Sequence, residues 1–398
     1  MTRYLLCVCL AVAMWACVEP FEPELGAYEE TLVVDGLLTD SDQPTVVRLS
    51  RSFAFAGESA QPVFGANVQI EEEGGNSIEL MERDSGLYVA DPDQFRGQAG
   101  KRYRLLLRLR DQSRYESDWE LLKPAPPVEN ISWVEEVQIP DDPDGLTSRG
   151  LKFMVTSQVG EGNTQFYRWI WEETYEYINP KPPFIQVVFP GNDPDSAQFS
   201  SIPQEEFAGF RCYKSLTSRR ILISDTESLS RDRVEDFPIH FVDLSTPRLY
   251  TRYSLLVRQF ALSRDYFRFL EKIEQINQST GSLFDPIPNE VFGNVRPVDG
   301  NQPVLGYFGV AGQSSKRIFV NREDLPLGFS APPGPLCQED TVQLGNFERL
   351  HLLLQQPNRV FHNYELNFVG NPIAYLLTSR PCSFCEDNGA TNVAPDYW

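Results

Sequence analysis

Apolar and polar residues alternate in short segments through the first third of the chain. The segment 66–70 alternates strictly, and an apolar run at 31–38 precedes it. The longest alternation spans 102–110, where one face carries Tyr103, Leu105, Leu107 and Leu109. Short strands at this spacing, separated by turns, are typical of an antiparallel β-sandwich of immunoglobulin-like size. We therefore predict that residues 30–123 form such a sandwich.

The opposite face of the segment 102–110 is basic, with Arg102, Arg104, Arg108 and Arg110. An anion site would use such a face. An antiparallel sheet, however, commonly leaves one of its faces in water. We interpret the four arginines as a solvated sheet face.

A proline-rich segment at 123–127 separates these strands from the rest of the chain. Proline-rich segments are stiff spacers, and strand-like patterns resume after this one. We predict that residues 128–398 form a larger β-rich domain, so that the whole chain is mostly β. One amphipathic helix is expected near 263–279, because Ser263 can cap it and Gly281 follows it.

The segment 166–177 is rich in aromatic residues. As a strand, one face carries Tyr167, Trp169, Trp171, Tyr175 and Tyr177, interrupted by Glu173. Such faces bind sugars, peptides or proteins through large, rigid surfaces. They also fill the cores of sheets, which is the commoner use. We favour the core interpretation and keep the five aromatic residues as candidate binding residues.

Residues 1–17 have the order of a secretory signal. Arg3 precedes the apolar run 5–16, which is too short to span a bilayer as a helix. We predict that residues 1–16 are a signal peptide and that Cys17 takes a lipid through its thiol. The acidic, proline-bearing residues 17–29 would then form a lipidated tether. An ordinary signal peptide followed by an incidental cysteine is the alternative.

Net charge narrows the range of partners. The formal net charge is −21, and removal of residues 1–16 takes away Arg3 and no acid, which leaves −22. A charge of this sign argues against nucleic acid or an anionic bilayer surface as a direct partner.

Four cysteines remain after Cys17, namely Cys212, Cys337, Cys382 and Cys385. An even number in an exported chain indicates disulfides, and four cysteines allow three pairings. Cys382 and Cys385 form a CxxC motif, for which a zinc site or a redox pair are the alternatives. The motif lies in an irregular tail, so we predict structural disulfides, either within the motif or from it to Cys337 or Cys212.

Catalytic signatures are mostly absent. The sequence has no GxSxG, HExxH, P-loop or Rossmann glycine pattern. Its three histidines, His240, His351 and His362, fall in separate segments. We therefore expect a protein that is not an enzyme and that uses no cofactor and no metal.

Several short segments, ordered along nearly the whole chain, resemble one family. They include Gly65-Ala66-Asn67-Val68, Gly86-Leu87-Tyr88, Tyr167-Arg168-Trp169, Cys212-Tyr213, Gly281-Ser282-Leu283-Phe284, Val304-Leu305-Gly306-Tyr307 and Cys382 with Cys385. The family comprises Bacteroidota lipoproteins and is catalogued as domain-of-unknown-function family 4249. The resemblance implies an outer-membrane lipoprotein, often encoded near TonB-dependent transporters. It supplies no activity and no catalytic residues.

These observations favour a non-catalytic outer-membrane lipoprotein that is a binding or accessory partner of a TonB-dependent transporter in nutrient uptake. The acids Glu19, Glu22 and Glu24, soon after Cys17, favour display on the cell surface. The membrane would be touched through the lipid anchor only. The alternatives are a structural envelope protein that binds another protein, and a hydrolase with an unfamiliar site.

Overall fold

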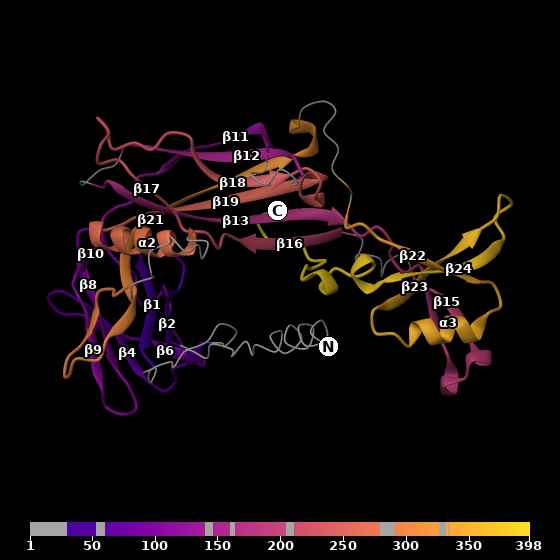
Figure 1. The fold of residues 1–398 in the computed structure, drawn as a ribbon, viewed down its shortest axis with the longest axis horizontal. Helices are drawn as coiled ribbons and strands as arrows, with labels where there is room; N and C mark the ends of the chain where they lie inside the picture. The colour runs from indigo at the N-terminus through magenta and orange to yellow at the C-terminus, as the bar shows by residue number, and fades with distance from the viewer. Residues whose placement is uncertain are drawn as a thin grey trace, which may run out of the picture.

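The computed structural model describes residues 30–52, 60–139, 146–159, 164–203, 211–278, 291–325, 332 and 334–398. Strands dominate this part of the chain, which confirms the predicted mostly-β class. The strands form three units in a row, which we name the N-terminal, central and C-terminal units (Figure 1). The predicted signal peptide, Cys17 and the tether lie outside the described residues.

The N-terminal unit is built from two sheets that share one core. One is part of a ten-stranded sheet that continues into the central unit; this part contains β1 (Leu32–Thr39), β2 (Thr45–Arg51), β3 (Gln61–Pro62), β6 (Met81–Asp84) and β7 (Leu87–Ala90). The other contains β4 (Asn67–Glu72), β5 (Ser77–Glu79), β8 (Arg102–Arg108), β9 (Arg114–Ser117), β10 (Glu120–Leu121) and β20 (Val295–Pro297). As the alternation predicts, Tyr103 and Leu105 of β8 are fully buried, whereas Arg102 and Arg108 are exposed.

The central unit also has two layers. The larger is the rest of the ten-stranded sheet and contains β13 (Phe166–Ile178), β16 (Arg211–Thr217), β17 (Leu222–Asp225), β19 (Arg252–Ala261) and part of β21 (Val304–Asn321). The smaller contains β11 (Val128–Gln138), β12 (Ser148–Ser157) and β18 (Phe237–Asp243).

One helix, α2 (Arg264–Gln278), packs on the larger layer of the central unit through Phe267 and Leu270. The Ser263 hydroxyl accepts a hydrogen bond from Tyr266 N at 3.2 Å, as an N-cap does. The helix predicted near 263–279 is therefore confirmed.

The C-terminal unit has a small core of its own. It contains β14 (Ile185–Val188), β15 (Gln198–Ser201), β22 (Glu339–Gln343), α3 (Phe347–Leu354), β23 (Arg359–Leu366) and β24 (Pro372–Ser379). Short 3₁₀ turns in the central and C-terminal units are η1 (Pro190–Asn192), η2 (Pro194–Ser196), η4 (Pro247–Leu249), η5 (Arg322–Asp324), η6 (Arg380–Cys382) and η7 (Glu386–Asn388). Neither α3 nor β14 was predicted from the sequence.

The long strand β21 belongs to two units. Its first half pairs in parallel with β1, from Val304 opposite Leu32 to Ala311 opposite Thr39. Its second half pairs antiparallel with β19, and the short strand β20 pairs with β9. Strand pairing therefore crosses the boundary that we predicted at 123–128. The segment 30–123 is not a self-contained sandwich, because two strands of its sheets come from much later in the chain.

A fragment of residues 30–123 should therefore fail to fold alone. It lacks β20 and β21, which supply Val295, Phe308 and Val310 to the core of the N-terminal unit. We expect no cooperative thermal transition by circular dichroism. Attachment of residues 291–312 through a flexible linker should restore one, since it returns both strands. A sharp transition of the shorter fragment would show that the missing strands are dispensable.

Candidate functional site

The aromatic face of β13 forms the core of the central unit. Tyr167, Trp169, Tyr175 and Tyr177 are buried, and Trp171 is partly buried against the same cluster. Strands of the smaller layer cover this face, so it presents no open surface to a ligand. The core interpretation is the one that the burial supports. The burial therefore favours packing in the core over ligand binding for these aromatic residues.

Glu173 interrupts that aromatic face and is completely buried. Its Oε2 accepts a hydrogen bond from the Tyr253 hydroxyl at 2.9 Å and lies 2.9 Å from His240 Nε2. Arg248 lies 3.2 Å from its Oε1. Burial, and next the neighbouring carboxylate, raises the pKa of Tyr253 well above its ordinary value, which keeps the hydroxyl a donor. A buried charge held by several partners is a structural element of this core.

Two disulfides join Cys212 to Cys385 and Cys337 to Cys382. The prediction of disulfides is confirmed, although the two cysteines of the CxxC motif bond to different partners and not to each other. Because each of the four sulfurs is bonded to another sulfur, a zinc site built from these cysteines is excluded. One bond joins the start of β22 to the turn after β24, and the other joins that turn to β16. Residues 382–385 therefore link the C-terminal unit covalently to β16 of the central unit.

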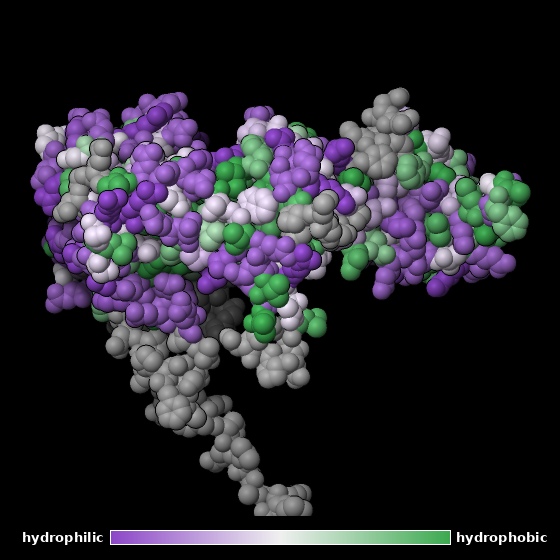
Figure 2. Space-filling model, turned by 90° about the horizontal axis from the view of Figure 1, so that it is seen from above, coloured by the Kyte–Doolittle hydropathy of each residue, from purple (hydrophilic) through white to green (hydrophobic). Residues whose placement is uncertain are grey.

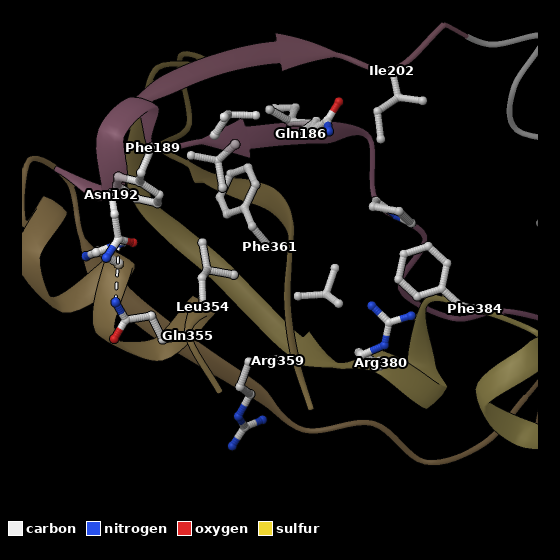
Figure 3. Close-up of a pocket in the computed structure, with 16 residues that line it drawn as sticks. Gln186, Phe189, Asn192, Ile202, Leu354, Gln355, Arg359, Phe361, Arg380 and Phe384 are labelled. Carbon is white, nitrogen blue, oxygen red and sulfur yellow. Dashed lines mark hydrogen bonds between the residues drawn. The ribbon is translucent and has the colours of Figure 1, made fainter. Parts of the chain in front are cut away.

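A groove opens in the C-terminal unit between the β14–β15 hairpin, the end of α3 and the start of β23 (Figure 3). The loop of the hairpin turns at Gly191, whose φ of 66° is a conformation that glycine adopts without strain. The Asp193 side chain then accepts a hydrogen bond from Asp195 N at 3.1 Å. The helix α3 begins where the Asn346 side chain accepts a hydrogen bond from Arg349 N at 3.0 Å. These local bonds set the two walls of the groove.

The groove has a volume of about 670 Å³. This is within the usual range for pockets that hold small organic ligands. Its walls are mainly apolar, with Pro183, Ile185, Val187, Val188, Phe189, Ile202, Leu354, Val360, Phe361 and Phe384. An apolar channel of this size on a surface is a candidate binding site.

Polar groups lie at the two ends of the groove (Figure 3). At one end, His351 Nε2 lies 2.9 Å from Asn192 Oδ1 and near the Gln355 amide. At the other end, the Arg380 guanidinium points into the cavity, 4.8 Å from the centre of the Phe384 ring. The groove can therefore hold a ligand that is apolar in its middle and polar at its ends.

The described lining of the groove contains arginine side chains and no acid, although the chain is strongly acidic. Among the described residues that line it, none is Asp or Glu, while two are arginines. Arg380 forms one ion pair with Asp387 at 3.1 Å, and Arg359 forms one with Asp340 at 2.8 Å. A guanidinium has five N–H donors, so one ion pair leaves Arg380 able to bind a further anion. Arg359 extends away from the cavity in Figure 3.

A smaller hollow of about 320 Å³ lies where α2 meets the N-terminal unit. In its wall, the Tyr307 hydroxyl donates a hydrogen bond to Glu120 Oε1 at 2.5 Å. Burial raises the pKa of both groups. The rest of its lining includes four charged residues, Asp118, Asp265, Arg268 and Lys272. It resembles ordinary ligand pockets less than the groove does, because such pockets are lined mainly by apolar side chains.

The family model described as "Domain of unknown function (DUF4249)" matches residues 18–317 of the chain. The chain belongs to the DUF4249 family. The match includes the N-terminal unit and most of the central unit, and it ends within β21. In this DUF4249 protein, α3 and β22 to β24 therefore lie beyond the matched residues. A search of curated proteins finds no match. Within the described residues of the DUF4249 protein, every helix is too short or too polar to span a bilayer.

The groove of this DUF4249 protein is not evident from the sequence alone. The residues that line it come from 183–202 and 351–384, which only the fold brings together. The apolar spacing of Leu350, Leu353 and Leu354 was a signal for α3, and the pair Ile185 and Val187 was a signal for β14. Both elements are short, and short segments carry weak periodicity.

Proposed function

We propose that this DUF4249 protein is a non-catalytic, lipid-anchored outer-membrane protein that binds a ligand in the groove and works with a TonB-dependent transporter. The groove is the observation that carries the binding role. It is open and mainly apolar, and it ends in polar groups of which one is cationic. The transporter as partner is supported by the family resemblance.

The arrangement of the units suits a surface protein held at its N-terminus. Cys17 precedes β1, which lies in the N-terminal unit, whereas the groove lies in the unit at the opposite end of the row (Figure 1). A lipid on Cys17 would therefore anchor one end and leave the binding end away from the bilayer.

The structural-envelope alternative also has an observation in its favour. Apolar side chains are exposed around the β23–β24 hairpin, including Leu366, Phe368, Val369 and Ile373. Figure 2 shows a green patch at this far end of the molecule. Exposed apolar patches of this kind mark contact sites for proteins. The hydrolase alternative has less support, because the described lining of the groove combines His351 with no acid.

Lipidation of Cys17 is tested by mass spectrometry of the mature protein. We expect an N-terminal Cys17 that carries diacylglycerol, and we expect Cys17→Ser protein to leave the membrane fraction. A free, unmodified amine at the mature N-terminus would contradict the anchor. So would membrane association of the Cys17→Ser variant.

The partnership is tested by affinity purification of the lipidated protein from native outer membrane. We expect a TonB-dependent transporter to co-purify in comparable molar amount. Filling the groove with Gln186→Trp should abolish nutrient uptake through that transporter, while Gln198→Trp, an equally exposed position on β15 that does not line the groove, should not. The proposal would be contradicted if the protein purified without a transporter, or if the Gln186→Trp and Gln198→Trp variants supported equal uptake.

A further inference from the structure

Strand β14 has one open edge. Among the described strands it pairs only with β15. Phe184 O accepts a hydrogen bond from Ile202 N at 3.0 Å, which sets the alternation of bonded pairs along the hairpin. In an antiparallel ladder, every second residue turns its N–H and C=O away from the partner strand. In β14 these residues are Ile185 and Val187, and both line the groove.

The opposite wall of the groove is also a strand edge. Strand β23 is the outer strand of the sheet β22–β24–β23. Arg380 N donates to Asn358 O at 3.2 Å, so the same alternation turns the N–H and C=O of Phe361 away from β24. The two edges meet at one point, where Phe184 N donates to His362 O at 3.0 Å. The groove lies between these edges.

We propose, building on the proposed function, that the groove takes an extended peptide segment that adds as a strand to the β14 edge and ends in a carboxylate on Arg380. Strand addition to an open edge is a general mode of peptide recognition, in which main-chain hydrogen bonds give affinity and side-chain pockets give specificity. One face of the bound peptide turns toward Phe361, and the apolar walls of the groove favour aliphatic side chains on that face of the peptide.

Charge complementarity points to the carboxylate. Arg380 points into a groove whose described lining has no acid, in a chain with a net charge of −21. The Arg380 guanidinium can donate hydrogen bonds to an anionic group of the ligand. Hydrogen bonds between arginine and a carboxylate are among the strong ones. The carboxylate is either the C-terminus of the peptide or an acidic side chain near it.

The test uses the full mature protein and five-residue synthetic peptides of alternating valine and threonine, with binding measured by calorimetry. The peptide with a free C-terminal carboxylate should bind, and its amidated form should bind about tenfold more weakly. Two further peptides carry N-methyl groups, one at the odd-numbered and one at the even-numbered residues. Only every second N–H of an added strand faces β14, so one of these peptides should lose binding and the other should keep it. An amidated peptide that ends in glutamate has a side-chain carboxylate but no terminal one. Its binding would show that a side-chain carboxylate is sufficient.

Variants of the protein supply the matched controls. Arg380→Gln should weaken binding of the free acid about tenfold and leave the amidated peptide unchanged. Arg349→Gln, which removes an exposed arginine of α3 that does not line the groove, should change neither. Val187→Pro should remove binding without loss of folding, because the N–H that it removes faces the groove and not β15.

Two results would overturn the inference. One is that none of the peptides binds, and the other is that all methylated peptides bind alike, which would indicate an apolar ligand without strand addition. Co-purification of the transporter despite either result would leave the proposed function standing and remove only the peptide as ligand.

Discussion

Replacement of Trp169 by alanine should lower the free energy of unfolding by about 3–5 kcal/mol. The Trp169 side chain is fully buried in the core of the central unit and stacks on Phe237 with 4.5 Å between ring centres. Its indole N–H donates to Gln259 Oε1 at 2.9 Å, and Gln259 is itself fully buried. The substitution therefore leaves both a cavity and an unpaired buried acceptor. Chemical denaturation of the mature protein measures the loss.

Trp171→Ala is the matched control, since it makes the same change two residues further along the same strand. Trp171 is only partly buried, and its ring stacks on His240 with 3.7 Å between centres. We expect a loss of about 1 kcal/mol, within the usual range for substitutions outside a fully buried core. A Trp169→Ala variant as stable as wild type would refute the core assignment of this face.

Loss of the two disulfides should also have a large effect on stability. In the chain-entropy model, a closed loop of 45 residues, as between Cys337 and Cys382, contributes about 4 kcal/mol. The loop of 173 residues between Cys212 and Cys385 contributes about 5 kcal/mol. We expect reduction of both to lower the denaturation midpoint strongly. Non-reducing peptide mapping should recover these two linkages and none between Cys382 and Cys385.

The two bonds should differ in what they hold together. The double variant Cys337→Ser/Cys382→Ser should loosen the C-terminal unit itself, because that unit has only a small core. The double variant Cys212→Ser/Cys385→Ser should leave this unit folded but release its tail from β16. Hydrogen exchange of β23 and β24 distinguishes the cases. If β23 and β24 exchange fast in Cys212→Ser/Cys385→Ser and slowly in Cys337→Ser/Cys382→Ser, then the bond between Cys212 and Cys385 is the one that stabilises the C-terminal unit.

Local periodicity accounts for what the sequence predicted well. Strict alternation in β8, a capped amphipathic pattern in α2 and an aromatic strand in β13 each reflect neighbours within one element. The groove could not be predicted, because its walls come from a four-residue strand and an eight-residue helix with weak patterns. The boundary after residue 123 was misplaced because the pairing of β1 with β21 is a long-range contact. The proline-rich segment at 123–127 connects β10 to β11 and does not end a folding unit.

The parallel pairing of β1 with β21 also constrains the order in which the chain can fold during synthesis. The ribosome makes β1 among the first described residues, while its partner β21 follows only after β2 to β20. Until then, β1 presents an unpaired edge to the surroundings, and such edges template association with other chains. Contacts between such distant segments also slow folding. A nascent chain stalled before residue 304 is thus exposed to aggregation through the free edge of β1.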